Sequence, residues 1–480
     1  MYNMLKVNNQ VIDLYSTLRT FEPSPINHST FIAVPFDAGR VNLESRGLAR
    51  LTSRLSALAS TASVLASTAL ALLLPFAAAQ SSSDFTTRDA PRLPGNAMQS
   101  NGISLGFLTQ WGSQYEPTDV IRALGKSPAV WGDYWNVWPD EYEFRQADWH
   151  LGEMRRVADG DVKAVYAPAV LFHGRMNQWT QEMTDALAEK VRDVNEQGVP
   201  IWLRFCYEMN GGWMDYGLQP EDYVSTWRSV TNAIRAVTNE TYMLWAPNVW
   251  NGDSNDIQAY QPYWPGEEYV DLVGLSLYSF GPYRSLNALP ENDLFRDSFR
   301  PFYNLVSPTS SSRNPLGLSR AYSVVIAETS APYYYEIPVN SPYYTQAGDT
   351  DISPPMPNLN RTRPSLADPP YPRSDDELAV KATWLVQMVG NETAAAFPNL
   401  KAVSLFNYLK KGNGTAEVLA DFRYVGSRDR FNATIEEWLR TNYGNNTAYL
   451  EGYSGDASAI RTSLLGLGGI VAVAIVVLAL

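Results

Sequence analysis

The sequence predicts an α/β protein whose main body is a (β/α)8 barrel, also called a TIM barrel. Between residues 101 and 445, short apolar runs typical of buried strands alternate with amphipathic helical segments. The alternation occurs eight times without a break. A doubly wound open sheet is the alternative, but the Gly-rich phosphate-binding loop that would favour it is absent from this region.

Each expected strand is an apolar run that ends at a polar residue or a turn signal. In chain order, the strands are expected at Gly102–Leu108, Ala129–Tyr134, Lys163–Phe172, from Val199 onward, and at Tyr242–Ala246, Val270–Leu277, Ser323–Ala327 and Lys401–Phe406.

The helices are predicted where apolar residues recur every three or four positions. Gly198 ends the third helix, and Pro220 suits the first turn of the fourth. The fifth segment has length for only a turn or two. The helices are expected at Pro117–Leu124, Arg145–Val157, Thr180–Glu196, Pro220–Val237, Ile257–Tyr263, Leu294–Leu305, Asp375–Val389 and Ile435–Tyr443.

One connection, residues 332–374, breaks this rhythm. It shows no helical or strand period and is dense in Tyr and Pro. Long loops inside a compact domain are usually functional or disordered. Because this loop follows the seventh strand, a barrel would place it on the face that carries the active site. The alternative is a solvated insertion without substrate contact.

The segment before the barrel reads like a targeting signal. Residues 51–79 follow a basic flank, contain the apolar run Val64–Phe76 and end in an Ala-x-Ala cleavage site at Ala77–Ala79. Secretory signals normally start near the initiator Met, so we interpret residues 1–50 as a gene-model artefact, with an internal anchor as the alternative. Residues 80–100 are a polar linker.

The segment after the barrel reads like an anchor signal. Residues 446–463 form a linker with small residues at Ser454–Ser458, and residues 464–480 are apolar. This order predicts a glycosylphosphatidylinositol (GPI) anchor at the cell surface or wall, with a transmembrane helix as the alternative. Sequons support passage through the secretory pathway as a glycoprotein; they lie at Asn239, Asn360, Asn391, Asn413, Asn432 and Asn445.

Composition limits the partners. The formal net charge of −13 argues against nucleic acid. The single cysteine, Cys206, excludes an intramolecular disulfide, and a reactive thiol there would need a base, for which His173 is the candidate. No ligand spacing suggests a catalytic metal. We expect no cofactor, a polysaccharide substrate and a monomer.

The run that starts at Val199 turns abruptly polar before a Gly-Gly pair. Because side chains alternate along a strand, four of them are expected on one face: Trp202, Arg204, Cys206 and Glu208. A carboxyl and a guanidinium then lie at the carboxyl end of a barrel strand, where TIM-barrel enzymes carry catalytic residues. The alternative is a buried structural Arg–Glu pair.

Glu328 follows the seventh strand, so a barrel aims it into the same mouth as Glu208. Hydrolysis of a glycosidic bond requires two such carboxyls, one to protonate the departing oxygen and one to attack the sugar or activate water. At a separation of about 5 Å the second carboxyl is a nucleophile and configuration is retained. Arg204 can hold it ionised, and Tyr278 can donate a hydrogen bond to it.

Several motifs occur in order along this chain: Tyr207-Glu208-Met209-Asn210-Gly211 with Arg204 and Trp213, Tyr223 with Trp227-Arg228, Trp245-Ala246-Pro247-Asn248, Tyr263-Trp264-Pro265-Gly266 through Tyr278, and Ile326-Ala327-Glu328-Thr329-Ser330. Over about Asn101–Tyr443 they resemble glycoside hydrolase family 26, the β-mannanase-like family. The resemblance implies a retaining clan-A barrel, with Glu208 as acid/base and Glu328 as nucleophile, in a fungal-type secreted and membrane-anchored member.

The chain departs from that family at two positions. Tyr207 stands where the family usually has His before the acid/base, and Phe406 is the nearest match to a Trp platform after the eighth strand. Further candidate substrate-binding residues are His173, Trp213, Trp245 and Asn248. Of these, His173 has a structural loop residue, and Trp245 a core residue, as the alternative.

The sequence thus predicts a retaining endo-β-glycosidase that hydrolyses O-glycosyl bonds of a β-linked polysaccharide. Mannan, β-1,3-xylan and mixed-linkage β-glucan are all open as substrates. The alternative is a non-catalytic carbohydrate-binding protein of the cell wall on a degenerate glycosidase barrel.

Overall fold

The computed structural model describes residues 86–111, 116–250, 257–281, 287–309, 314–336, 350–351, 377–411, 418–426 and 433–444. The predicted signal, the N-terminal extension, the anchor segment and the sequons at Asn360, Asn413, Asn432 and Asn445 lie outside these residues. Within the described part of the chain, no helix combines the length and the apolar composition needed to cross a membrane.

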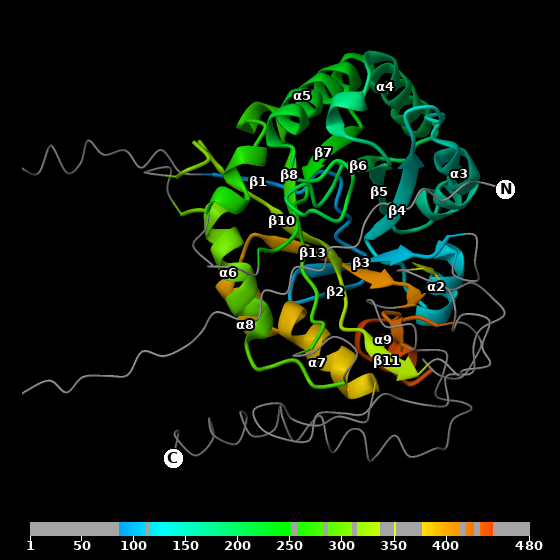
Figure 1. Ribbon diagram of the computed structural model, residues 1–480. Helices are drawn as coiled ribbons and strands as arrows, with labels where there is room; N and C mark the ends of the chain where they lie inside the picture. Colours follow the sequence, from blue (N-terminus) through cyan, green and yellow to red (C-terminus); the bar gives the residue numbers. More distant parts are fainter. Residues whose placement is uncertain are drawn as a thin grey trace, which may run out of the picture. The chain divides into compact units, whose positions relative to one another are not determined.

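Within the described residues, eight parallel strands close into a barrel, which confirms the predicted fold class (Figure 1). The ring runs β3-β4-β5-β6-β7-β8-β10-β13 and is closed by the pairing of β13 with β3. The strands are β3 (Ile103–Thr109), β4 (Val130–Val137), β5 (Val165–Phe172), β6 (Ile201–Phe205), β7 (Thr241–Trp245), β8 (Leu272–Ser276), β10 (Val324–Thr329) and β13 (Leu400–Asn407). Antiparallel β2 (Gln99–Ser100) extends β3.

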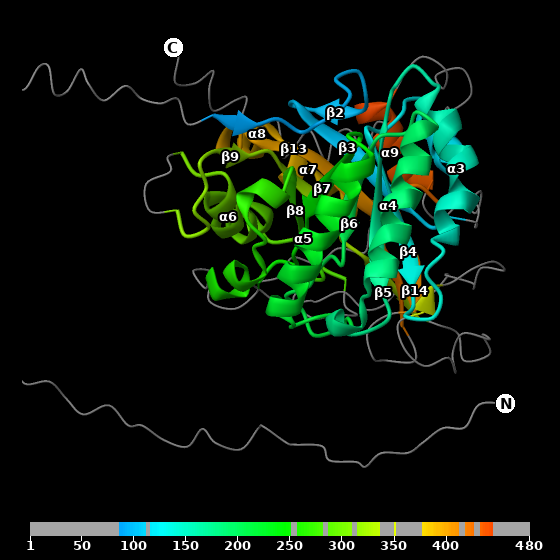
Figure 2. The ribbon, with the colours of Figure 1, turned by 90° about the horizontal axis from the view of Figure 1, so that it is seen from above.

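The helices surround the strands, and a view turned by 90° shows α4 beside α5 (Figure 2). Thr180 accepts a hydrogen bond from the Met183 N–H at 3.3 Å and so caps α4, while Gly198 follows the helix at φ 82°. The helices are α2 (Pro117–Leu124), α3 (Arg145–Ala158), α4 (Gln181–Glu196), α5 (Pro220–Val237), α6 (Leu294–Val306), α7 (Glu377–Val389), α8 (Asn391–Ala396) and α9 (Ala433–Tyr443).

The fifth helix is the exception, because the chain there forms short 3-10 turns instead of the expected α-helix. These are η2 (Ile257–Ala259) and η3 (Gln261–Tyr263), followed by η4 (Glu267–Tyr269); η1 (Met176–Gln178) lies after β5. Pro262 inside this short segment lacks the N–H that an α-helix would use. Helical turns nevertheless connect β7 to β8, so the barrel order is kept.

Close packing between neighbouring barrel strands requires a glycine at position 132. A Cβ on Gly132 of β4 would lie 2.2 Å from Cγ of Leu108 on the neighbouring strand β3. A side chain there would therefore force the two strands apart.

The chain that precedes β3 is attached to the barrel by strand pairing and by side-chain hydrogen bonds. β1 (Thr87–Arg88) pairs with β9 (Ala321–Tyr322). The Trp202 indole of β6 donates to the Pro91 carbonyl at 2.8 Å.

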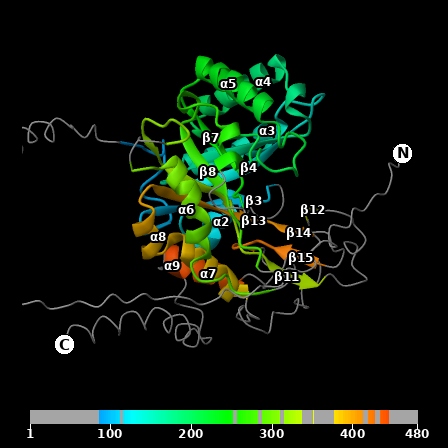
Figure 3. The same cartoon turned by 60° about the vertical axis from the view of Figure 1, so that its left-hand side comes forward.

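The connection at residues 332–374 contributes two strands to a small sheet that the sequence did not indicate; the other two strands of that sheet follow β13. β11 (Tyr333–Glu336), β12 (Thr350–Asp351), β14 (Leu409–Lys411) and β15 (Val418–Asp421) form a small antiparallel sheet in the order β11-β15-β14-β12 (Figure 3). β11 thus pairs with a strand that follows the last barrel strand. Because this partner is remote in sequence, β11 carries no local signal of its pairing.

Buried charges attach this small sheet to α7. The Lys381 ammonium lies between Glu377 on α7 and Asp421 on β15, and Arg423 donates to Asp421 at 2.7 and 2.9 Å. Tyr335 of β11 donates to Glu377. The small sheet is therefore held by an ion-pair network at the carboxyl end of the barrel.

Candidate active site

Glu328 occupies the penultimate position of β10, and one donor reaches each of its carboxyl oxygens. Arg204 Nη2 of β6 donates to Oε2 at 2.7 Å, and the Tyr278 hydroxyl after β8 donates to Oε1 at 2.6 Å. Both interactions stabilise the ionised carboxylate. Arg204 is 1% exposed; burial alone would lower its pKa, but the charge of Glu328 raises it overall.

Glu208 reaches the same mouth by a different route from the one expected. β6 ends at Phe205, and Cys206 and Glu208 then adopt left-handed backbone angles, φ 45° and 54°. The alternation that was predicted to carry Glu208 therefore stops three residues earlier. A hydrogen bond from the Glu208 N–H to the Ala246 carbonyl, 2.8 Å, holds this turn against β7. Left-handed non-Gly residues cost about 1–3 kcal/mol each and cluster at functional sites.

The Glu208 carboxyl is buried and receives the Trp213 indole N–H on Oε2 at 2.7 Å. Burial, and next the negative charge of Glu328, raise the pKa of Glu208. Ser276, Asn248 and Trp213 oppose this shift only in part. A carboxyl with a raised pKa holds its proton at higher pH, which suits a general acid.

Three tyrosines surround this carboxyl pair. The Tyr207 ring lies over the Arg204 guanidinium at 4.6 Å and 5.6 Å from the ring of Tyr134. Burial, followed by the charges of Glu328 and Glu208, raises the pKa of Tyr207, so it remains a neutral phenol near both carboxyls. Burial and Glu328 also raise the pKa values of Tyr134 and Tyr278.

Two residues of the site were not identified from the sequence. Tyr134 is the last residue of the expected strand Ala129–Tyr134, and only the closed barrel shows that it meets Tyr207. Asn210 exchanges two hydrogen bonds of 2.8 Å with the backbone of Asn248 and so fixes the β6 turn to the chain after β7. The quoted motif contains Asn210, but the motif does not reveal its partner.

Of the other predicted residues, Trp213 is largely exposed and His173 partly exposed, each in a segment that follows a barrel strand, and Phe406 is buried. Trp213 is 59% exposed beside Glu208, and His173 after β5 pairs with Asn136 at 2.9 Å; burial lowers the His173 pKa, although Asp215 opposes this. Phe406 is buried, with Tyr278 at 5.9 Å and Tyr408 stacked at 4.4 Å.

Trp245 is a core residue, so its expected place among the substrate-binding residues is wrong. Its side chain is 0% exposed, its indole donates to the Tyr263 carbonyl at 3.0 Å, and its ring packs against Trp264 and Phe302. The side chain therefore faces the helical layer, away from the barrel mouth.

Cys206 is buried as well, and burial raises the pKa of its thiol, the opposite of what a reactive thiolate needs. Among the residues that the structure describes, no three His, Cys, Asp or Glu side chains are grouped to hold a metal ion.

Residues 165–309 match the model of glycosyl hydrolase family 26. This segment runs from β5 through α6 and contains Arg204, Glu208 and Tyr278, whereas Glu328 lies beyond it. The turn with Glu208 and the Tyr278 donor thus belong to the part of the chain that is similar to family 26.

Two curated relatives are mannan endo-1,4-beta-mannosidases. The protein from Bacillus subtilis (strain 168) is 30% identical over 234 residues, 39% of this chain and 62% of that protein. The one from Bacillus subtilis is 24% identical over 223 residues, 38% of this chain and 59% of that protein. The chain therefore spans about three fifths of the length of these relatives. A solved modular endo-beta-1,4-mannanase from Cellulomonas fimi aligns at 12% identity and a TM-score of 0.43, over 73% of this chain and 74% of that one.

Proposed function

We propose that the protein is a retaining endo-β-glycanase that cuts a β-linked polysaccharide by double displacement. The proposal rests on one observation: two carboxyls at the same barrel mouth have different hydrogen-bond donors and different electrostatic surroundings. Glu328 receives hydrogen bonds from Arg204 and Tyr278, whereas burial and the charge of Glu328 raise the pKa of Glu208. Carboxyls whose environments differ in this way divide the nucleophile and acid roles between them.

In the first step, the Glu328 carboxylate attacks the anomeric carbon while Glu208 gives its proton to the departing glycosidic oxygen. The Trp213 N–H stabilises the Glu208 carboxylate that this transfer leaves. Because the charge of Glu328 contributes to the raised pKa of Glu208, esterification of Glu328 lowers that pKa. Glu208 is then prepared to remove a proton from the water that cleaves the ester.

β-1,4-Mannan is the first substrate to test, since the two curated relatives described above are named mannan endo-1,4-beta-mannosidases. Tyr207 and Phe406 differ from the His and Trp of the family pattern, so β-1,3-xylan and mixed-linkage β-glucan belong in the same panel. A hydroxyl group at the Tyr207 position offers a different hydrogen bond from an imidazole, which can redirect the choice of sugar.

The test is to incubate the purified full chain with this panel and follow chain length and anomeric configuration of the first products by NMR. We expect internal cleavage of one polysaccharide with retention, and no cleavage by Glu328→Ala. Inversion would contradict the nucleophile role of Glu328. Binding to a polysaccharide without any cleavage would favour the alternative, a sugar-binding protein.

We further propose that the barrel faces outward from the cell on a GPI anchor. Support comes from the small-residue cluster before residues 464–480 and from two sequons, Asn239 and Asn391, whose side chains are exposed. Phosphatidylinositol-specific phospholipase applied to intact cells should release the protein, and a glycosidase that removes N-linked sugars should reduce its mass. Retention at the membrane with residues 464–480 still present would favour a transmembrane helix.

A further inference from the structure

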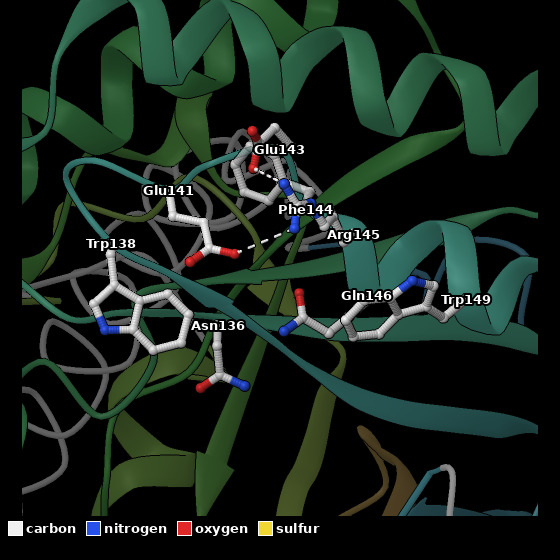
Figure 4. A pocket seen from close by; sticks show the side chains of 8 residues that line it. All are labelled: Asn136, Trp138, Glu141, Glu143, Phe144, Arg145, Gln146 and Trp149. Atoms are coloured by element: carbon white, nitrogen blue, oxygen red, sulfur yellow. Dashed lines mark ion pairs between the residues drawn. The ribbon is translucent and has the colours of Figure 1, made fainter.

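A hollow of two exposed indoles lies beside the barrel mouth, between the end of β4 and the first turns of α3 (Figure 4). Trp138 and Trp149 stand on opposite sides of it, and the amides of Asn136 and Gln146 lie between them. Trp138 is 37% exposed and Trp149 is 68% exposed. Exposed tryptophans forgo a large apolar burial, so a pair lining one hollow calls for an explanation.

The hollow is built rigidly. Trp138 and Glu141 exchange backbone hydrogen bonds of 2.9 and 3.1 Å, which close a tight turn. Phe144 then adopts φ 52° and packs its buried ring edge-on against Trp135 at 6.0 Å. One face of the Trp138 indole stacks on His173 at 4.4 Å and 9°. The indole is thus held in place before any ligand arrives, which reduces the entropy lost on binding.

The lining chemistry favours a neutral ligand with apolar faces and hydroxyl edges. Arg145 is flanked by Glu141 at 3.7 Å and Glu143 at 3.5 Å, so the rim carries no excess positive charge for an anion. Primary amides can both donate to and accept from hydroxyl groups. Indole faces pack on apolar surfaces, such as the C–H face of a pyranose ring.

The hollow is continuous with the candidate active site. Asn136 pairs with His173, whose ring supports Trp138. Asn136 also follows Tyr134 by two positions on β4, so both side chains share one strand face about 7 Å apart. The Tyr134 ring lies against Tyr207, which is next to the carboxyl pair.

We propose that this hollow is a distal carbohydrate subsite, in which Trp138 and Trp149 hold sugar units of the polysaccharide remote from the bond that is cleaved. The inference rests on the proposed glycanase function and adds an anchoring site for the substrate chain. Long substrates then gain affinity from the hollow, whereas substrates that fill only the catalytic end do not.

The test compares Trp149→Ala with Val237→Ala, a truncation of an exposed apolar residue at the end of α5. With mannohexaose, β-1,3-xylohexaose or a mixed-linkage β-glucan hexasaccharide, whichever is cleaved, Trp149→Ala should raise KM about tenfold at unchanged kcat. Hydrolysis of a nitrophenyl β-glycoside with one or two sugar units should be unchanged. Val237→Ala should match the wild type on all substrates.

Binding of the same hexasaccharides to the inactive Glu328→Ala chain, measured by calorimetry, gives a readout independent of turnover. Adding Trp149→Ala should weaken this binding about tenfold, and Trp138→Phe should weaken it less. A KM or Kd for the hexasaccharide within twofold of the parent chain would overturn the subsite, as would no hexasaccharide binding at all. Failure of the parent chain to cleave either the hexasaccharides or the nitrophenyl glycosides would instead count against the proposed function.

Discussion

The ends of β10 and β6 present two carboxyls in opposite ways. Glu328 stands within strand β10 and has a charged and a neutral donor, one for each oxygen. Glu208 stands on a left-handed turn after its strand has ended, with the indole of a largely exposed tryptophan as its donor. The strands of the barrel thus hold the carboxyl that we propose as the nucleophile, whereas a turn beyond β6 holds the carboxyl that we propose as the acid.

Removal of each carboxyl should separate the two roles most strongly. Glu328→Ala removes the attacking group and should lower kcat about 10⁴-fold or more on any substrate. Glu208→Ala should lower kcat/KM on the polysaccharide about 10²- to 10⁴-fold. On a dinitrophenyl glycoside, whose leaving group needs no proton, formation of the intermediate should persist as a burst of phenol. Equal losses for both variants on both substrates would contradict the division of roles.

Replacement of Arg204 should destabilise the fold as well as the site. Arg204→Met leaves the Glu328 carboxylate in a buried place without its cation, which typically costs about 3–5 kcal/mol of unfolding free energy. The double variant Arg204→Met/Glu328→Gln removes both charges and should recover part of that loss. Urea unfolding of the wild type, Arg204→Met and the double variant measures these differences in unfolding free energy. A double variant that is no more stable than Arg204→Met would argue against a direct charge pairing.

Tyr278→Phe should have a smaller effect, because it removes one hydrogen bond to Glu328 and keeps the ring. A hydrogen bond to a charged group contributes about 1.5–3 kcal/mol, so kcat/KM should fall about 10- to 100-fold. Thermal unfolding should shift by only a few degrees, in contrast to Arg204→Met. Tyr322→Phe, which removes a hydroxyl at the opposite end of the barrel, is the matched control and should leave kcat/KM unchanged.

Trp213→Phe should have the smallest effect on activity and should shift the pH dependence of kcat/KM. The indole N–H favours the ionised form of Glu208, so its loss raises the Glu208 pKa further. In the proposed mechanism Glu208 acts first as an acid, so the alkaline limb of kcat/KM should move to higher pH. Measurement on a short nitrophenyl glycoside, with Trp149→Phe as the control, isolates this effect; a limb that moves to lower pH would reverse the assigned role of the indole.

The regular elements could be predicted because their signals are local. α2 and α5 occupy the expected residues Pro117–Leu124 and Pro220–Val237, since an apolar period and a Pro at the first turn act within one helix. The small sheet could not be predicted, because β11 pairs with β15 across a remote part of the chain.

The positions of the two carboxyls could be predicted because they depend only on the topology of the barrel. Glu208 and Glu328 follow from the rule that the carboxyl ends of barrel strands converge. Trp245 was misplaced because both faces of a barrel strand are buried, so apolar composition does not tell the core face from the mouth. The left-handed angles of Cys206 and Glu208 were missed because neither residue type signals a positive φ.

The contact between Trp213 and Glu208 also gives the protein an optical reporter. Indole emission responds to the charge and polarity beside the ring, and this indole donates directly to the carboxyl that is proposed to exchange its proton. The chain has 14 tryptophans, so the signal is the difference between wild type and Trp213→Phe. That difference spectrum should change with pH as Glu208 ionises, and this pH dependence should be lost in Glu208→Gln, which would make the protonation of a buried carboxyl visible in a fluorimeter without any added label.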